Sequence, residues 1–293
     1  CQPVTGRVVN AMFRCLVVLW AAFASLAAGA APPLLTPNEL DALRKSKSVR
    51  VVDIRDVDAY AAKHIPGAVS APYDEWRGPS SNPGELPDLA LLAPLVRRLG
   101  LHPAVHAVVV SSGEDVSDFG AAARVYWSLK VLGLTELSIL NGGLEAWEAA
   151  RLPQGAAPVA VQASTFVPTL DRSLIASRDD VRALIASKQA RLVDARPADF
   201  FRGHQRHPVA VVPGTLRGAV NLEHSRWFAP GSATMVPADQ ARSVAAMLPG
   251  GPDRPTVSFC NTGHRAATNW FALSALAGQK NAKLSPGSRV DWT

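Results

Sequence analysis

The chain has 293 residues, of which 48% are hydrophobic and 18% are charged. This composition excludes a disordered polymer, and the length allows two domains that each bury a core without disulfides. The net charge of +6 comes with no dense basic run, which excludes a nucleic-acid-binding arm. A mild positive charge suits small anionic substrates, because it raises their concentration near the protein.

The first 30 residues have the pattern of a few upstream residues followed by a cleavable signal peptide. Met12 is the expected initiator, residues 15–28 are apolar, and Ala28-Gly29-Ala30 offers a small-residue cleavage site. The apolar stretch is shorter than the roughly 20 residues that cross a bilayer, so we expect no membrane span in the mature chain. The alternative is a buried N-terminal helix. We therefore expect a protein that is periplasmic or secreted.

Cleavage of this segment would remove Cys1 and Cys15 and leave Cys260 as the single cysteine. A single thiol cannot form an internal disulfide, and in an oxidising compartment it is a free reactive group. The alternative is a small buried side chain that fills a gap in the core. The loop that follows Cys260 favours the reactive thiol.

Strand-like and helix-like segments alternate along the rest of the chain, which indicates an α/β fold with parallel sheets. Buried strands are predicted over residues 51–55, 108–110, 192–196 and 256–259. Helices are predicted over residues 37–45, 122–132, 177–187 and 266–277, with Ser177 as an N-cap.

Several sequence features occur in the same order in both halves of the chain. The Asp-x-Arg that ends at Arg55 recurs 141 residues later, ending at Arg196, and the turn at Gly67 recurs 151 residues later at Gly218. Gly133, Gly142 and Trp147 recur 145 residues later as Gly278, Gly287 and Trp292. A shared order of several features indicates a duplication. We expect two domains, each a small parallel sheet flanked by helices on both faces, over residues 34–152 and 171–293, with a linker over residues 153–170.

The strand over residues 256–259 brings Cys260 to the carboxyl edge of the predicted second sheet, where ligands bind in such folds. A tight loop that enters a helix points successive backbone N–H groups inward, which makes a cradle for an anion and favours the nucleophilic thiolate. Gly263 allows a backbone conformation that a side chain would forbid. Arg265 adds a permanent charge, and His264 is a second candidate donor.

The length of the loop distinguishes between two chemistries. Cysteine-dependent phosphatases use Cys-x5-Arg to surround a phosphoryl group, whereas Arg265 is the fifth residue after Cys260. The loop is one residue shorter, so it is expected to enclose a single sulfur atom better than a tetrahedral oxyanion.

The chain resembles the tandem-domain rhodaneses, the thiosulfate or 3-mercaptopyruvate sulfurtransferases, and in its loop their exported bacterial type. The resemblance covers nearly all of residues 34–293. It rests on Asp53-x-Arg55, His64-Ile65-Pro66-Gly67-Ala68, Gly142-Gly143-Leu144-Glu145-Ala146-Trp147, Asp194-x-Arg196, Arg217-Gly218-Ala219-Val220-Asn221, the Cys260 loop and Gly287-x-x-x-x-Trp292. The family resemblance implies that the second domain is catalytic and the first is silent. The first-half loop over residues 112–118 is acidic and has no cysteine.

The resemblance also implies a mechanism. Cys260 would take sulfur from a small anionic donor, thiosulfate or 3-mercaptopyruvate, and become a persulfide. The N–H groups of residues 261–265 would hold that sulfur, and cyanide, a thiol or a protein cysteine would accept it. The residues expected to bind the persulfide or the substrate are Asn261, Thr262, Gly263, His264 and Arg265. The family needs no metal or organic cofactor, and its site lies between the two domains, so a monomer is expected.

The residues at three positions do not identify the sulfur donor. Thiosulfate-preferring loops place two basic residues after the cysteine, and mercaptopyruvate-preferring loops place Gly-Ser or Gly-Ala there. This chain has Asn261 and Thr262, which match neither pattern. Family members often carry a substrate arginine at the position of Phe200, and Arg202 is either its replacement or a solvated loop charge.

Asp194 and Arg196 end the strand beside the loop, and they either support the loop or pair only with each other. His204, His207 and His224 lie in a polar segment at spacings unlike those of a structural zinc site, so we expect no metal there.

The residues leave three functions to compare. The first is a sulfurtransferase that acts through a Cys260 persulfide. The second is a non-catalytic rhodanese module that binds or carries sulfur for a partner. The third is a cysteine-dependent phosphatase or arsenate reductase, which the loop length and the lack of a second thiol disfavour.

Overall fold

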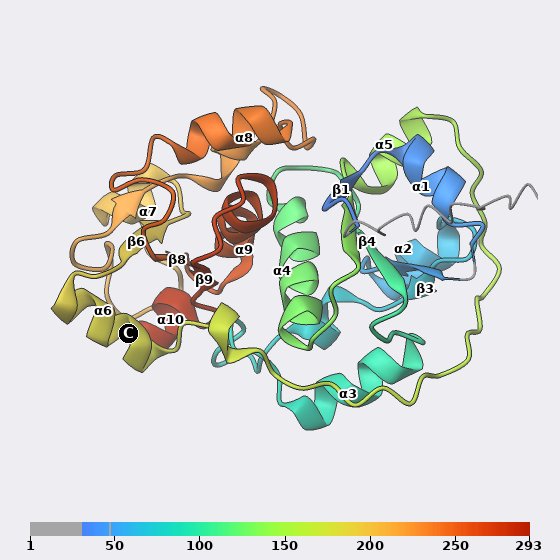
Figure 1. The fold of residues 1–293 in the computed structure, drawn as a ribbon, viewed down its shortest axis with the longest axis horizontal. Coiled ribbons are helices and arrows are strands. Elements are labelled where there is room, and N and C mark those ends of the chain that lie inside the picture. The colour runs from blue at the N-terminus through green and yellow to red at the C-terminus, as the bar shows by residue number, and fades with distance from the viewer. Residues whose placement is uncertain (1–30, 47) are drawn as a thin grey trace, which may run out of the picture.

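The computed structural model describes residues 31–46 and 48–293, and the expected signal peptide lies outside this part. Figure 1 shows two lobes that correspond to the two repeats, the first coloured blue to green and the second yellow to red. No helix within the described ranges is long and apolar enough to cross a membrane.

Each lobe contains a parallel sheet. The first sheet has five strands in the order β1 (Leu34–Leu35), β5 (Leu137–Leu140), β4 (His106–Val110), β2 (Val49–Asp53) and β3 (Val69–Ser70). The second has four strands in the order β7 (Val220–Asn221), β6 (Arg191–Asp194), β8 (Thr256–Phe259) and β9 (Ala282–Leu284). A parallel bridge between Ile175 and Leu284 occupies the place that β1 has in the first sheet.

Helices cover both faces of each sheet. The first domain contains α1 (Pro37–Leu43), α2 (Val57–Ala62), η1 (Tyr73–Trp76), α3 (Leu89–Arg98), α4 (Asp118–Val131) and α5 (Gly143–Ala149). The second contains η2 (Arg172–Leu174), α6 (Arg178–Ser187), α7 (Ala198–Arg202), η3 (His224–Trp227), α8 (Ala238–Ala245), α9 (His264–Phe271), the π-helical turn η4 (Ala272–Leu276) and α10 (Ser288–Trp292).

The strands are buried on both faces, as parallel strands between two helical layers must be. Successive strand residues point to opposite faces, so Val108 packs in one core with Leu40 of α1 and Trp147 of α5. Its neighbour Val109 packs in the other core with residues of α3 and α4 such as Leu92. The β-branched residues of these strands therefore stabilise two layers at once.

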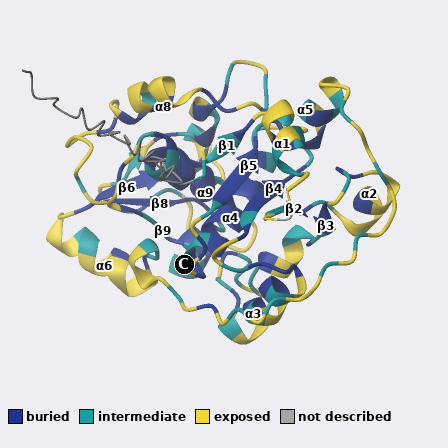
Figure 2. Cartoon of the chain, turned by 45° about the vertical axis from the view of Figure 1, so that its right-hand side comes forward, coloured by how far each residue is buried: buried dark blue, intermediate teal, exposed yellow. Residues whose placement is uncertain are grey.

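The two domains share one core along α4 and α9, which lie side by side at the centre of Figure 1. Phe119 and Tyr126 of α4 meet the ring of Phe271 edge-on, at centroid distances of 5.6 and 5.0 Å. Nearly all of α4 is buried, whereas α6 and α8 expose much of their surface (Figure 2). A single hydrophobic cluster spans both lobes, which fixes α9 against the first domain.

The linker is not a free spacer. In Figure 1 it runs along the outside of the first domain from α5 to η2. The backbone of Ser164 donates to the carbonyl of Arg97, and the Arg97 Nε donates to the carbonyl of Phe166 at 2.7 Å. These contacts hold the linker on the surface of the first domain.

Matching hydrogen bonds show which residues of the two domains are equivalent. The N–H of Arg289 donates to the carbonyl of Cys260, and the N–H of Leu144 donates in the same way to the carbonyl of Ser111. Cys260 directly follows β8, and Ser111 directly follows β4, a central strand of its sheet in each case. Ser111 is therefore the counterpart of Cys260 in the first domain.

Candidate active site

Cys260 lies at the carboxyl edge of β8, is a free thiol and is only 2% exposed. Its backbone N–H donates to the Ser288 hydroxyl at 3.0 Å, and that hydroxyl donates to the carbonyl of Ser285 at 2.7 Å. The N–H groups of Arg289 and Val290 donate to the carbonyls of Cys260 and Asn261. The start of α10 thus fastens the first two residues of the loop.

The rest of the loop leaves its backbone donors open. The N–H groups of residues 261–265 make no hydrogen bond with any residue that the structure describes. Gly263 precedes α9 with a φ of +71°, in the left-handed region that favours glycine. Five successive open donors at a helix N-terminus are an arrangement that can bind an anion.

In the equivalent loop of the first domain, carboxylates of the loop itself accept from three backbone N–H groups. The N–H of Gly113 donates to Asp118 Oδ2 at 2.6 Å. The N–H groups of Ser117 and Asp118 donate to Asp115 Oδ1 at 2.6 and 2.8 Å. This loop has Ser111 in place of the cysteine, and an external anion would have to displace these carboxylates.

Asp194 and Arg196 both pair with each other and support the loop. Arg196 donates to both carboxylate oxygens of Asp194, at 2.9 Å from Nε to Oδ1 and 2.7 Å from Nη2 to Oδ2. Its Nη1 donates to the Asn261 Oδ1 at 3.0 Å. Because all three side chains are buried, this network fixes the orientation of Asn261.

His264 points away from the loop interior and into the first domain. Its Nε2 lies 2.6 Å from the carbonyl of Ser117, and its Nδ1 lies 3.0 Å from the Tyr73 hydroxyl. A carbonyl only accepts, so Nε2 carries the proton and Nδ1 accepts from Tyr73. Burial, with the nearby Arg77 guanidinium, lowers the pKa of His264 to about 4, so the ring is neutral at physiological pH. Its ring anchors the loop, and only its backbone N–H remains open towards Cys260.

Two arginines of the first domain reach the back of the loop, and neither was predicted from the sequence. Arg77 donates from Nη2 to the carbonyl of Thr262 at 3.0 Å and from Nη1 to the Tyr73 oxygen at 2.9 Å. Arg124 of α4 lies behind Gly263, where a Cβ would come within 2.6 Å of its Nη1. No sequence pattern marks these residues, because they act across the domain interface.

The structure separates the two candidate arginines of the second domain. Arg265 is half-buried and lies close enough to His224 to affect its charge. Arg202 is exposed at the end of α7, and its side chain makes no hydrogen bond or ion pair with a described residue. Phe200 stacks near Arg196, whose Cζ lies 5.9 Å from the ring centroid.

The side chain of His224 is buried, although the sequence placed this residue in a polar segment. It begins η3, and its backbone N–H donates to the carbonyl of Ala195. Its Nε2 has no hydrogen-bond partner among the described residues. Burial and Arg265 lower its pKa to about 4, although Ala195 and Asp115 oppose this shift.

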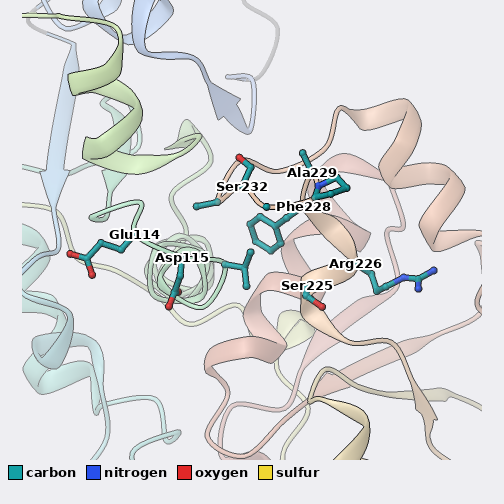
Figure 3. A pocket seen from close by; sticks show the side chains of 11 residues that line it. Glu114, Asp115, Ser225, Arg226, Phe228, Ala229 and Ser232 are labelled. Carbon is teal, nitrogen blue, oxygen red and sulfur yellow. The ribbon is translucent and has the colours of Figure 1, made fainter.

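A cleft of about 600 Å³ lies between the domains next to η3. Figure 3 shows Glu114 and Asp115 of the first domain on one side, and Ser225, Arg226 and Phe228 of the second on the other. The cleft is therefore bordered by acidic side chains of the first domain and by the basic Arg226 of the second. Ser225, which also lines it, directly follows His224 in the sequence.

Comparison with known proteins identifies the fold and the class. The rhodanese-like domain family matches residues 36–150 and 177–293. The chain belongs to this family. Both rhodanese domains are those expected from the repeat, and the α/β fold with two parallel sheets is confirmed.

Several relatives of this rhodanese are sulfurtransferases. It is 32% identical over 238 residues to thiosulfate sulfurtransferase of Bos taurus, which covers 80% of this chain and 78% of the bovine protein. It is 31% identical over 272 residues to thiosulfate sulfurtransferase of Azotobacter vinelandii, with 92% and 95% covered. The structure is similar to that of SseA from Escherichia coli, described as a 3-mercaptopyruvate sulfotransferase, with a TM-score of 0.77 at 23% identity over 88% of this chain and 99% of SseA. The expectation of a sulfurtransferase enzyme is confirmed.

Gly263→Ala tests whether the Cys260 loop needs a glycine because neighbouring residues pack closely against it, as well as because of its backbone conformation. A left-handed φ at alanine costs about 1 to 2 kcal/mol in the free energy of unfolding. At Gly263 the added methyl would also collide with the Pro286 carbonyl and Arg124. Gly218→Ala is the matched control, because Gly218 has a φ of +79° and nothing within 4 Å of the added carbon. Urea unfolding should show a larger loss at Gly263. Equal losses would contradict the close packing.

His264→Gln tests the neutral imidazole. The folded-state pKa of about 4 lies below the unfolded value of about 6.5, so the unfolded state binds more protons between these values. Stability should therefore fall as the pH falls through this window. The variant should show a shallower dependence of unfolding free energy on pH, measured with urea. His204→Gln, at an exposed position, is the control, and an unchanged slope in His264→Gln would refute the assignment.

Proposed function

We propose that the protein transfers sulfane sulfur from a small anionic donor to a thiophilic acceptor through a persulfide on Cys260. The observation that carries the proposal is the set of open N–H groups of residues 261–265 around a buried, free cysteine. They supply donors for the charge of a terminal sulfur in a site from which water is largely excluded. The relatives named thiosulfate and 3-mercaptopyruvate sulfurtransferase support the same class of donor.

The chemistry is a double displacement. The Cys260 thiolate attacks the outer sulfur of thiosulfate, the S–S bond of the donor breaks, and its electron pair leaves with sulfite. The acceptor then attacks the terminal sulfur of the persulfide, and the electron pair of that S–S bond returns to Cys260 as thiolate. Cyanide leaves as thiocyanate, and a thiol leaves as a persulfide. Both steps conserve electrons, so the residues of this chain need only activate the thiol and hold the charged sulfur.

We propose that the first domain does not load sulfur. Ser111 is a poor substitute for a thiolate, and the N–H groups of Gly113, Ser117 and Asp118 in its loop are already bonded to Asp115 or Asp118. The choice of donor stays between thiosulfate and 3-mercaptopyruvate. Asn261 and Thr262 carry no charge, and the exposed Arg202 is the candidate for contact with the substrate.

Mass spectrometry of the intact protein tests the proposed function. After incubation with thiosulfate, or separately with 3-mercaptopyruvate, the wild-type chain should gain one sulfur atom and lose it on addition of cyanide. Cys260→Ser should gain none, and Ser111→Cys with Cys260→Ser should also gain none, because carboxylates already occupy three N–H donors of the first-domain loop.

The same experiment separates the alternatives. A carrier module would load sulfur but release it slowly to cyanide or small thiols. Hydrolysis of an aryl phosphate without any loading of Cys260 would replace the proposal with a phosphatase.

We further propose that residues 1–30 direct export, so that the protein acts in the periplasm or outside the cell. The apolar stretch over residues 15–28 and the Ala28-Gly29-Ala30 sequence support this proposal. Expression of the full chain in a Gram-negative host should give a periplasmic protein whose sequence begins at Ala31. Recovery of an uncleaved chain in the cytoplasm would contradict export.

A further inference from the structure

Arg124 is a buried charge without a carboxylate partner. It lies on α4, is 0% exposed, and donates from Nη2 to the carbonyls of Gly84 and Glu85 at 2.8 and 3.3 Å. Its Nε and Nη1 have no hydrogen-bond partner among the described residues, and no described carboxylate forms an ion pair with it. The guanidinium also lies over the ring of Trp127, at 4.9 Å from the centroid.

An isolated buried cation is costly, because it has lost its hydration without gaining an opposite charge. Burial, with the neighbouring Arg77, lowers the pKa of Arg124 to about 10, so the side chain remains cationic at neutral pH. Two groups oppose this shift when they are anionic, Tyr73 and Cys260. Burial raises the pKa of Tyr73, so its hydroxyl is neutral at physiological pH. Of these two groups, Cys260 is therefore the one at which a negative charge would face Arg124.

The backbone of the loop is shaped to admit this arginine. The Cα of Gly263 faces the Arg124 Nη1 so closely that a Cβ would lie 2.6 Å from it. The first domain also holds the loop through Arg77 on the Thr262 carbonyl and Tyr73 on His264. The side chains that follow Cys260, Asn261 and Thr262, bring no charge of their own. Besides Arg196 and Arg265 of the second domain, the loop therefore has positive charge next to it that comes from the other domain.

We propose that Arg124 of the first domain is the buried counter-charge of the Cys260 thiolate and of its persulfide. The inference rests on the proposed function and deepens it, because it makes the cysteine-free domain part of the active site. Arg124 acts through the field behind the loop and is a positioning residue. Its removal should disfavour an anion at Cys260 and an anionic reagent approaching it.

Two alkylating reagents of nearly equal size measure this field. Iodoacetate is anionic and iodoacetamide is neutral, so the ratio of their rates with Cys260 reports the local potential and not the mobility of the loop. Arg124→Gln removes the charge and retains an N–H donor for Gly84, and it should lower the iodoacetate-to-iodoacetamide ratio by on the order of tenfold. Arg124→Lys keeps the charge and should retain most of the wild-type ratio.

Arg191→Gln is the matched control. Arg191 is also a buried arginine, 3% exposed, but it begins β6 at the opposite edge of the sheet and donates to Thr256. Its loss should lower stability and leave the ratio unchanged. An unchanged ratio in folded Arg124→Gln, or an equal fall in Arg191→Gln, would overturn the proposal.

The wild-type protein provides a second test that does not depend on folding of a variant. Alkylation of Cys260 with iodoacetate leaves a carboxylate beside Arg124, and alkylation with iodoacetamide leaves a neutral amide of nearly the same shape. The carboxylate form should have the higher Tm, and equal Tm values would contradict a counter-charge role. Neither readout requires sulfur transfer. Failure of Cys260 to load sulfur would therefore reject the proposed function while leaving these outcomes to decide the role of Arg124.

Discussion

The site depends on backbone N–H groups that stay unpaired next to a cysteine. The loop from Asn261 to Arg265 can keep its donors open because its carbonyls and side chains are fastened elsewhere, to α10, to Arg196 and to the first domain. An open donor in a buried site is costly, so such a loop is stable only when its surroundings determine its conformation. The first-domain loop differs, because Asp115 and Asp118 accept from three of its backbone N–H groups and Ser111 stands at the position of the cysteine.

The two domains have therefore diverged into complementary parts of one site. The duplication preserved the sheets and the backbone bonds that connect each central strand to the last helix of its domain. Near the interface, however, α4 supplies Arg124 and η1 supplies Tyr73 to the loop of the other domain. The shared core of α4 and α9 gives these contacts a rigid base. The second domain on its own would lack Arg77 and Arg124 next to its loop.

Local patterns allowed much of this to be predicted. The repeat gave two parallel-sheet domains, β8 lies where the buried run over residues 256–259 placed it, and Ser177 caps α6 through a capping box with Asp180. The helix predicted over 266–277 begins earlier, at His264, and passes into a π-helical turn at Ala272. Contacts between domains have no local signature. Arg77 and Arg124 were missed for that reason. His224 lies in a segment whose polar composition gave no sign that its side chain is buried, and substrate binding by Arg202 stays a prediction.

The most direct test of the account is a crystal structure of the protein after reaction with its sulfur donor. We predict one additional sulfur bonded to the Cys260 Sγ, within hydrogen-bonding distance of the N–H groups of residues 261–265, with the first-domain loop unmodified. An added sulfur that points to solvent and leaves these donors open would contradict the central claim.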